Sequence, residues 1–231
     1  MTNAVLDRGW VTRQTGDRSE ITGAVNKEEA ATLASIILNN NCKRCYETGV
    51  AYGLSTLAIT QAVARLGGRH IGMDPLQSAH GNAALCLLAE HDLAAFFTLM
   101  EGPSHLMAPR LLETNEQFDF AFIDGMHTFQ HKLVDYFFAD QLLKVGGWLV
   151  FHDLVLASVK KVLRFIETQH NYRLCLTPGL EPSSARKLRY VAGAFIKGRS
   201  LWSYWPNRFA NLLVLQKLEA KEFAWDYFCS F

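Results

Sequence analysis

CYETGVAYGLST, residues 45–56, is the stretch that decides the fold of this chain. A short strand pattern ends there at an acid and a threonine, and two glycines, Gly49 and Gly53, precede a helical pattern. In the dinucleotide-binding spacing G-x-G-x-x-G, the second glycine lets a pyrophosphate lie over the helix N-terminus. Here the bulky pair Ala51-Tyr52 lies between the glycines. The stretch therefore favours a ligand without phosphates, with a tight turn whose glycines serve only packing as the alternative.

Strand and helix patterns alternate along most of the chain. The first helix opens at Asn26-Lys27-Glu28-Glu29, where a capping residue is followed three positions later by an acid. The expected strands are 44–48, 70–74, 96–100, 118–124, 148–151, 172–175 and 211–217, and the later helices are 54–66, 82–93, 104–112, 129–143 and 159–170. Such alternation implies right-handed crossovers and a parallel sheet covered on both faces. The fold class predicted is α/β.

Composition excludes several functions. The 231 residues suit one large α/β domain, and 23 Lys+Arg against 22 Asp+Glu give a net charge of +1, without the basic footprint of a nucleic-acid partner. No apolar run approaches the ~20 residues that cross a bilayer, and the polar N-terminus lacks a signal peptide's apolar region. The odd count of 5 cysteines predicts reduced thiols and a cytoplasmic protein. We interpret the C-x-x-C at Cys42 and Cys45 as inert, because no second ligand pair follows for zinc.

Acidic residues follow four of the expected strands, at or just after the strand ends: Glu47, Asp74, Asp124 and Asp153. Ligands of such sheets bind beyond the carboxyl ends of the strands, so these carboxylates are candidate ligand contacts. Asp74 lies about 20 residues beyond the glycines, where an acid can accept from both hydroxyls of a ribose. A turn with Pro75, or a helix N-cap, is its structural alternative.

These features in order resemble a class I S-adenosylmethionine-dependent methyltransferase. The resemblance rests on E-x-G-x-x-x-G-x-S after the first strand, an acid after the second, a loop after the third, an apolar fourth strand ending in Asp, and Gly146-Gly147 before the fifth. It runs from about residue 44 to 165, and more loosely to 217. It implies a doubly wound, Rossmann-like sheet, mostly parallel with an antiparallel last strand, and helices on both faces.

The expected organisation is a single domain over residues 1–231. An N-terminal helical segment takes 1–41, the cofactor-binding core takes 42–177, and an insertion, the last strand and an aromatic tail take 178–231.

By the same resemblance, S-adenosylmethionine is the cofactor. Its expected contacts are Glu47, Gly49, Gly53 and Ser55 of the glycine motif, Asp74 at the ribose, Ser104 in the loop Glu101-Gly102-Pro103-Ser104 beside the adenine, and Asp124 near the methionine end.

Two further motifs, DGMH at 124–127 and FHD at 151–153, indicate the chemistry. Methyl transfer to oxygen requires the acceptor hydroxyl to lose its proton, through a general base or a bound cation. The motifs resemble small-molecule O-methyltransferases, which implies Asp124 and Asp153 as ligands of Mg²⁺, and Asp124 and His127 as catalytic residues, with His127 the base.

The metal pattern departs from the family at one position. Many metal-dependent members carry a second Asp or Asn after the strand-five acid, where this chain has Leu154. The metal site is then incomplete, or completed by His152, Glu47 or another acid. The structural alternatives are that His127 and Asp153 cap helices and that His152 is a buried, hydrogen-bonded histidine.

The predicted function is S-adenosylmethionine-dependent O-methylation of a small molecule, such as a sugar or a natural product. A catalytically silent cofactor- or partner-binding domain is the alternative, and the glycine spacing disfavours a nicotinamide-dependent dehydrogenase. Acceptor contacts are expected from residues 1–26, 178–190 and 190–210. The aromatic cluster 202–205 either lines the acceptor pocket or forms the face of a homodimer.

Overall fold

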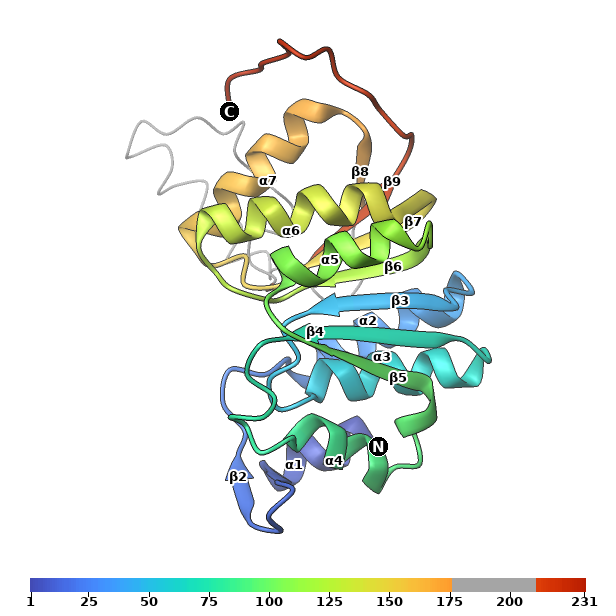
Figure 1. The fold of residues 1–231 in the computed structure, drawn as a ribbon, viewed down its shortest axis with the longest axis vertical. Helices are drawn as coiled ribbons and strands as arrows, with labels where there is room; N and C mark the ends of the chain where they lie inside the picture. Colours follow the sequence, from blue (N-terminus) through green and yellow to red (C-terminus); the bar gives the residue numbers. More distant parts are fainter. Residues whose placement is uncertain (176–210) are drawn as a thin grey trace, which may run out of the picture.

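The computed structural model describes residues 1–175 and 211–231, and its centre is a sheet of seven strands in the order β5-β4-β3-β6-β7-β9-β8 (Figure 1). The strands are β3 (Arg44–Thr48), β4 (Arg69–Asp74), β5 (Phe97–Glu101), β6 (Phe118–Ile123), β7 (Leu143–Phe151), β8 (Tyr172–Cys175) and β9 (Leu213–Lys217). Neighbours from β5 to β7 pair in parallel, and β9 is antiparallel to both β7 and β8. The predicted fold class, with its antiparallel last strand, is confirmed.

Helices cover both faces of the sheet. The helices are α1 (Thr2–Arg8), α2 (Lys27–Asn39), α3 (Leu54–Arg65), α4 (Ala83–Glu90), α5 (Ser104–Glu113), α6 (Phe129–Leu142) and α7 (Ala157–Gln169), with a 3-10 turn at Ala94–Phe96. In Figure 1, α5 and α6 lie in front of the sheet, while α2 and α3 lie behind it. Among the described residues no helix combines the length and the apolar character that crossing a membrane requires.

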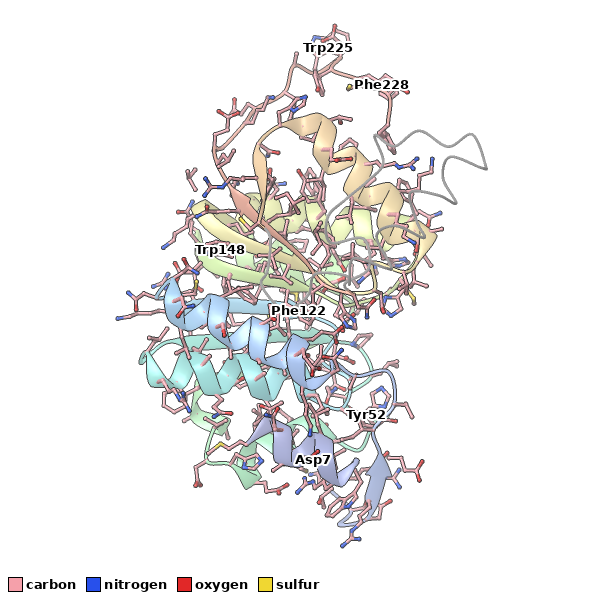
Figure 2. All side chains as sticks on the ribbon, turned by 180° about the vertical axis from the view of Figure 1, so that it is seen from behind. Asp7, Tyr52, Phe122, Trp148, Trp225 and Phe228 are labelled. Atoms are coloured by element: carbon pink, nitrogen blue, oxygen red, sulfur yellow. The ribbon has the colours of Figure 1, made fainter. Side chains whose placement is uncertain are left out.

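The sequence of β6 explains why both faces are covered. Phe120 and Phe122 pack into the core beneath α2 and α3, whereas Ala121 and Ile123 pack into the core beneath α6 and α7. Figure 2 views the molecule from the α2 side, with Phe122 behind that helix. All four side chains are fully buried, as expected for a central parallel strand, which reads as a continuous apolar run.

The N-terminal segment contains a hairpin besides its helices. Strands β1 (Trp10–Thr12) and β2 (Arg18–Glu20) pair antiparallel, and the predicted helical segment 1–41 did not include them. The guanidinium groups of Arg8 and Arg18 lie 4.5 and 4.0 Å from the Trp10 ring centroid. Arg8 also pairs with Glu90 of α4, so the hairpin is attached to the body of the domain.

The aromatic C-terminal tail packs on the body of the domain only in part. The Phe231 ring contacts that of Phe165, with centroids 5.3 Å apart, but Trp225 and Phe228 are 97% and 80% exposed. Figure 2 shows both at the top of the molecule. The expectations for 178–190, 190–210 and the cluster 202–205 lie outside the described residues.

One buried histidine predicts how stability depends on pH. His70 of β4 is fully buried, its Nδ1 lies 2.9 Å from Thr60 Oγ1, and burial lowers its pKa to about 3. In the unfolded chain the pKa is about 6.5, so the unfolded state takes up a proton first as the pH falls. We expect the free energy of unfolding to decline from pH 6.5 towards 3, and less steeply in His70→Gln. Denaturant titrations between pH 4 and 8 measure this.

Thr60→Val is the matched control, because it removes the hydroxyl but keeps the imidazole. It should retain the slope of the parent protein. Parallel stability curves for the parent and His70→Gln would contradict the assignment.

Candidate active site

The register of the sheet brings the ends of four strands into one row. Thr48 of β3 is paired with Met73 of β4 and Ile123 of β6, and Ile123 is paired with Phe151 of β7. Asp74 is the last residue of β4. The first residues after β3, β6 and β7 are Gly49, Asp124 and His152. The ladder continues through Gly49 N to Met73 O, Asp124 N to Thr48 O and His152 N to Ile123 O, at 2.9, 2.9 and 3.2 Å. These residues are therefore neighbours at the carboxyl edge of the sheet. The order of the strands reverses there about β3, and α/β sheets bind their ligands at such a point.

The two glycines of the opening motif give room to neighbouring backbone. Both have φ of +85°, a conformation that favours glycine. A Cβ on Gly49 would lie 2.4 Å from the carbonyl oxygen of Asp124, and a Cβ on Gly53 would lie 2.8 Å from Cα of Ala84. The glycines thus hold the loop after β6 and the helix α4 against the turn, which agrees with the packing interpretation and leaves a cofactor contact as a prediction.

Asp74 holds the glycine turn in place. Its Oδ2 accepts from the backbone N–H groups of Val50 and Ala51 at 2.9 and 2.8 Å, and its Oδ1 accepts from Leu76 at 2.7 Å. The residue is 5% exposed. Its turn-forming alternative is therefore realised, and each carboxylate oxygen has about two acceptor sites, so Oδ1 keeps one for a hydroxyl.

Glu47 lies inside the domain under the turn. It is fully buried, Thr56 Oγ1 donates to its Oε1, and Oε2 has no partner among the described residues. Burial raises the pKa of Glu47 to about 8, although the hydroxyls of Thr56 and Ser55 oppose the shift. Ser55, on the first turn of α3, is itself buried. Both motif residues are thus buried beside the turn.

Ser104 turns its hydroxyl towards a buried carboxylate. It donates to Asp135 Oδ1 at 2.6 Å, and Thr48 Oγ1 donates to Asp135 Oδ2 at 3.1 Å. Burial raises the pKa of Asp135 and lowers that of the nearby Lys132, whose ammonium donates to the carbonyl oxygen of Ile123 at 3.1 Å. These two buried side chains of α6 connect the helix to the end of β3, the start of α5 and the end of β6.

His152 lies among three carboxylates. Its Nδ1 lies 3.1 Å from Asp124 Oδ1 and 3.6 Å from Asp153 Oδ1, and its Nε2 lies 3.3 Å from Glu29 Oε2. The Asn211 amide nitrogen is 3.0 Å from the same Nε2. Burial alone would lower the pKa of His152, but hydrogen bonds to the carboxylates raise it to about 11. Its structural alternative, a buried and hydrogen-bonded histidine, is realised within the candidate site itself.

His127 and Asp153 form a pair at the surface of this cluster. His127 Nε2 lies 3.2 Å from Asp153 Oδ2, and 46% of the His127 side chain is exposed. Neither residue caps a helix, since the N-caps of α6 and α7 are Thr128 and Leu156. The hydrogen bond with His152 is the main reason that the pKa of Asp153 falls to about 2. An ionised carboxylate therefore lies beside an accessible imidazole, the pair of groups that general-base catalysis uses.

Asp153 lies near both other predicted residues: its Oδ2 is 3.2 Å from His127 Nε2, and one of its ligand atoms lies within 4.8 Å of one of Asp124. Leu154 is 4% exposed and packs in the core, so it offers nothing to a cation. Four residues that sequence reasoning missed are Glu29, Lys132, Asp135 and Asn211. Only Glu29 carried a signal, in the capping sequence before α2, and that signal predicted a helix start rather than a site contact.

The sheet order, the glycine turn under Asp74 and the acidic row beyond β6 and β7 define a class I methyltransferase fold. Residues 46–154 match a family of methyltransferase domains. The matched part of the chain therefore resembles a methyltransferase domain, in agreement with the family predicted from the sequence. No curated protein matches the chain.

Solved structures of similar fold include O-methyltransferases. The O-methyltransferase TomG from Streptomyces achromogenes, involved in tomaymycin synthesis and solved with SAM, has a TM-score of 0.63 at 16% identity, over 85% of this chain and 82% of that one. A Bacillus cereus O-methyltransferase in complex with SAH has a TM-score of 0.65 at 13% identity, over 86% and 84%. Cofactor-bound Rv0187 from MTB has a TM-score of 0.65 at 17% identity, over 94% and 88%.

Proposed function

We propose that the protein transfers a methyl group from S-adenosylmethionine to a hydroxyl of a small-molecule acceptor. The observation that carries the proposal is the pair of His127 and Asp153, beside Asp124 at the carboxyl edge of the sheet. An accessible imidazole backed by an ionised carboxylate suits the removal of a proton from a hydroxyl. The methyltransferase fold supplies the cofactor side of the same edge, and the similar structures named with SAM or SAH support the choice of cofactor.

The orientation of the His127 imidazole indicates which of its nitrogens accepts the proton of the acceptor hydroxyl. His127 Nε2 lies 3.2 Å from Asp153 Oδ2. With the proton of the neutral imidazole on Nε2, Nδ1 keeps the lone pair that accepts the proton of the acceptor hydroxyl. The acceptor oxygen then forms a bond to the methyl carbon as the carbon–sulfur bond breaks, and Asp153 stabilises the imidazolium that results. S-adenosylmethionine, when bound, supplies the methyl group on a sulfonium that leaves as a neutral thioether.

We assign the cofactor contacts to the glycine turn and the row beside it. Asp74 Oδ1 is the expected acceptor for a ribose hydroxyl, and the turn at Gly49 and Gly53 lies under the methionine portion. Glu47, Ser55 and Ser104 act indirectly, because Glu47 is fully buried and Ser104 donates to Asp135. Asp124 is the expected contact at the methionine end.

A divalent cation is part of the proposal. Asp124 and Asp153 are its expected oxygen ligands, since one ligand atom from each, with one from His152, lie within 4.8 Å of one another. Two carboxylates with waters suit Mg²⁺, the ion that the sequence predicts. When bound, the cation would lower the pKa of the acceptor hydroxyl. His127 would remain free to accept the proton.

Calorimetry and methyl transfer test the function. We expect S-adenosylmethionine and S-adenosylhomocysteine to bind and NAD not to bind. Labelled cofactor, incubated with hydroxylated metabolites with and without divalent cations, should yield methylated acceptor. Binding of NAD alone would overturn the assignment. Cofactor binding without turnover on any acceptor would favour the catalytically silent alternative.

The remaining sequence-based expectations stay predictions. A small-molecule acceptor, no nucleic-acid partner and a homodimer are expected, and size-exclusion chromatography with light scattering measures the last. A cytoplasmic location is expected from the cysteines, all five of which are free thiols.

A further inference from the structure

Lys132 of α6 places an ammonium group in the interior of the domain. Its side chain is fully buried, which is rare for a lysine unless it is paired. Burial is the main cause that lowers the pKa of Lys132, although the charges of Asp124, Asp135 and Asp153 oppose the shift. A lowered pKa means that folding disfavours the charged form of a lysine. At neutral pH the ammonium therefore makes folding less favourable, not more.

The hydrogen bonds of this ammonium are too few to account for its burial. An ammonium has three N–H donors, and among the described residues the acceptor of Lys132 is the carbonyl oxygen of Ile123, at 3.1 Å. Two donors have no partner in that part of the chain. A buried polar group without partners destabilises a protein, so stability does not explain why a lysine stands here.

Lys217 provides a comparison within the same chain. It is 5% exposed, and its Nζ donates to the carbonyl oxygens of Asp140 and Leu143. Its Nζ also lies 3.3 Å from Asp140 Oδ1. Lys217 is thus a fully paired structural lysine beside the last turn of α6, whereas Lys132 is a poorly paired lysine near the first turn, where the site lies.

The acceptor of Lys132 is the backbone oxygen directly before Asp124. The same oxygen accepts from the N–H of His152 at 3.2 Å, so it joins the ends of β6 and β7. Lys132 reaches this point from α6, in front of the sheet in Figure 1. At the other end of the loop, Ser158 Oγ of α7 donates to the carbonyl oxygen of His127 at 2.5 Å. Side chains of α6 and α7 therefore fix both ends of the loop that carries Asp124 and His127.

The charge of Lys132 also acts on the acidic row. Asp124 is the expected contact at the methionine end of the cofactor, and Asp153, with a pKa of about 2, is ionised at neutral pH. Negative charges stabilise the sulfonium of S-adenosylmethionine, which becomes a neutral thioether when the methyl group leaves. Stabilising the reactant more than the transition state raises the barrier to transfer. A fixed positive charge at the end of β6 reduces that excess stabilisation.

We infer that Lys132 is a positioning residue for methyl transfer: it fixes the loop that carries Asp124 and His127, and its charge keeps the site from binding S-adenosylmethionine too tightly relative to S-adenosylhomocysteine. The inference rests on the proposed function of the same site. It explains why a buried ammonium is kept although it lowers stability, as is common at functional sites. Lys132 acts through the loop and its charge and takes up no proton in the reaction.

Lys132→Met tests the inference, because methionine keeps an unbranched side chain but has neither charge nor N–H donors. We expect the free energy of unfolding to rise, since no ammonium is then buried. The ratio of the affinities for S-adenosylmethionine and S-adenosylhomocysteine should shift towards S-adenosylmethionine by about 5- to 50-fold, as one charge gives over about 7 to 15 Å at an effective dielectric constant of about 20. The kcat should fall about 10- to 100-fold, because the loop is less well positioned. Denaturant titration, calorimetry with each ligand, and turnover with labelled cofactor measure the three effects.

Two further variants separate charge from structure. Lys217→Met removes the paired lysine at the far end of α6, so it should lower the free energy of unfolding and leave the affinity ratio of the parent unchanged. Lys132→Gln keeps N–H donors without the charge, so it should shift the affinity ratio as Lys132→Met does. A Lys132→Gln variant with the ratio of the parent protein would show that the charge has no such effect.

Three results would overturn the inference: a Lys132→Met variant less stable than the parent protein, an affinity ratio that stays the same in it, or an equal shift of the ratio in Lys217→Met. A structural lysine would give the first two, because its loss weakens both ligands alike. If the parent protein bound neither ligand, the proposed function would fail and the inference with it. If it bound both and the ratio did not shift, the inference alone would fail.

Discussion

His127→Gln is expected to lower kcat for methyl transfer about 10²- to 10⁴-fold, the usual contribution of a positioned general base. Glutamine keeps a polar side chain but cannot take up the proton of the acceptor hydroxyl. The side chain lies at the surface of the site, where 46% of it is exposed, so the variant should fold like the parent protein. Turnover at saturating acceptor, with labelled S-adenosylmethionine, measures the effect, and cofactor affinity should stay unchanged.

His131→Gln is the matched control. His131 lies four residues further along the chain in the first turn of α6, where its Nδ1 is 2.7 Å from Thr128 Oγ1 and its ring lies beside that of His105. Its replacement should leave kcat within about two-fold of the parent, as surface substitutions usually do. A His127→Gln variant that turned over at the parent rate would remove His127 as the base, and an equal loss in His131→Gln would assign the effect to the surroundings of α6.

The fold was predictable because its signals are local. The apolar run of β6 from Phe118 to Ile123 has no polar face, and such a strand is buried on both sides. The turn glycines and the capping sequence of α2 fix where elements begin. The hairpin of β1 and β2 was missed because strands of three residues carry too little pattern, and Arg18-Ser19-Glu20 is polar throughout.

The candidate site could be predicted from the sequence only for functional residues that come directly after a strand. Asp124 and Asp153 could be placed together because the carboxyl ends of neighbouring parallel strands meet at one edge. Glu29 could not, because it contacts His152 across 123 positions of sequence, from a helix on one face of the sheet. No periodic pattern in the sequence indicates that contact, since it depends on how α2 packs against the sheet.

The sequence also could not predict the direction in which a side chain points. Ser104 was expected beside the adenine, but its hydroxyl donates to Asp135, which lies on α6 and is 3% exposed. A buried carboxylate needs donors, and it takes them from Ser104 and Thr48, the nearest hydroxyls. The Ser104 hydroxyl thus points to Asp135 because the buried carboxylate requires hydrogen-bond donors.

Gly49→Ala is expected to destabilise the protein by more than about 3 kcal/mol and to abolish cofactor binding in the fraction that folds. The backbone at Gly49 has φ of +85°, where an L residue costs roughly 1–2 kcal/mol. The added Cβ would also lie 2.4 Å from the carbonyl oxygen of Asp124 and 2.7 Å from its carbonyl carbon. Since both atoms belong to backbone, either the turn or the loop after β6 must move, and Asp124 with it.

Gly67→Ala separates the two causes. Gly67 also has positive φ, +64°, but a Cβ there would meet nothing within 4 Å. It should show the conformational cost alone, about 1 kcal/mol, with full cofactor affinity. Denaturant unfolding and calorimetry with S-adenosylhomocysteine on both variants measure the difference. If Gly49→Ala lost no more stability than Gly67→Ala and still bound the product, the close approach of Gly49 to Asp124 would not be what shapes the cofactor side of the site.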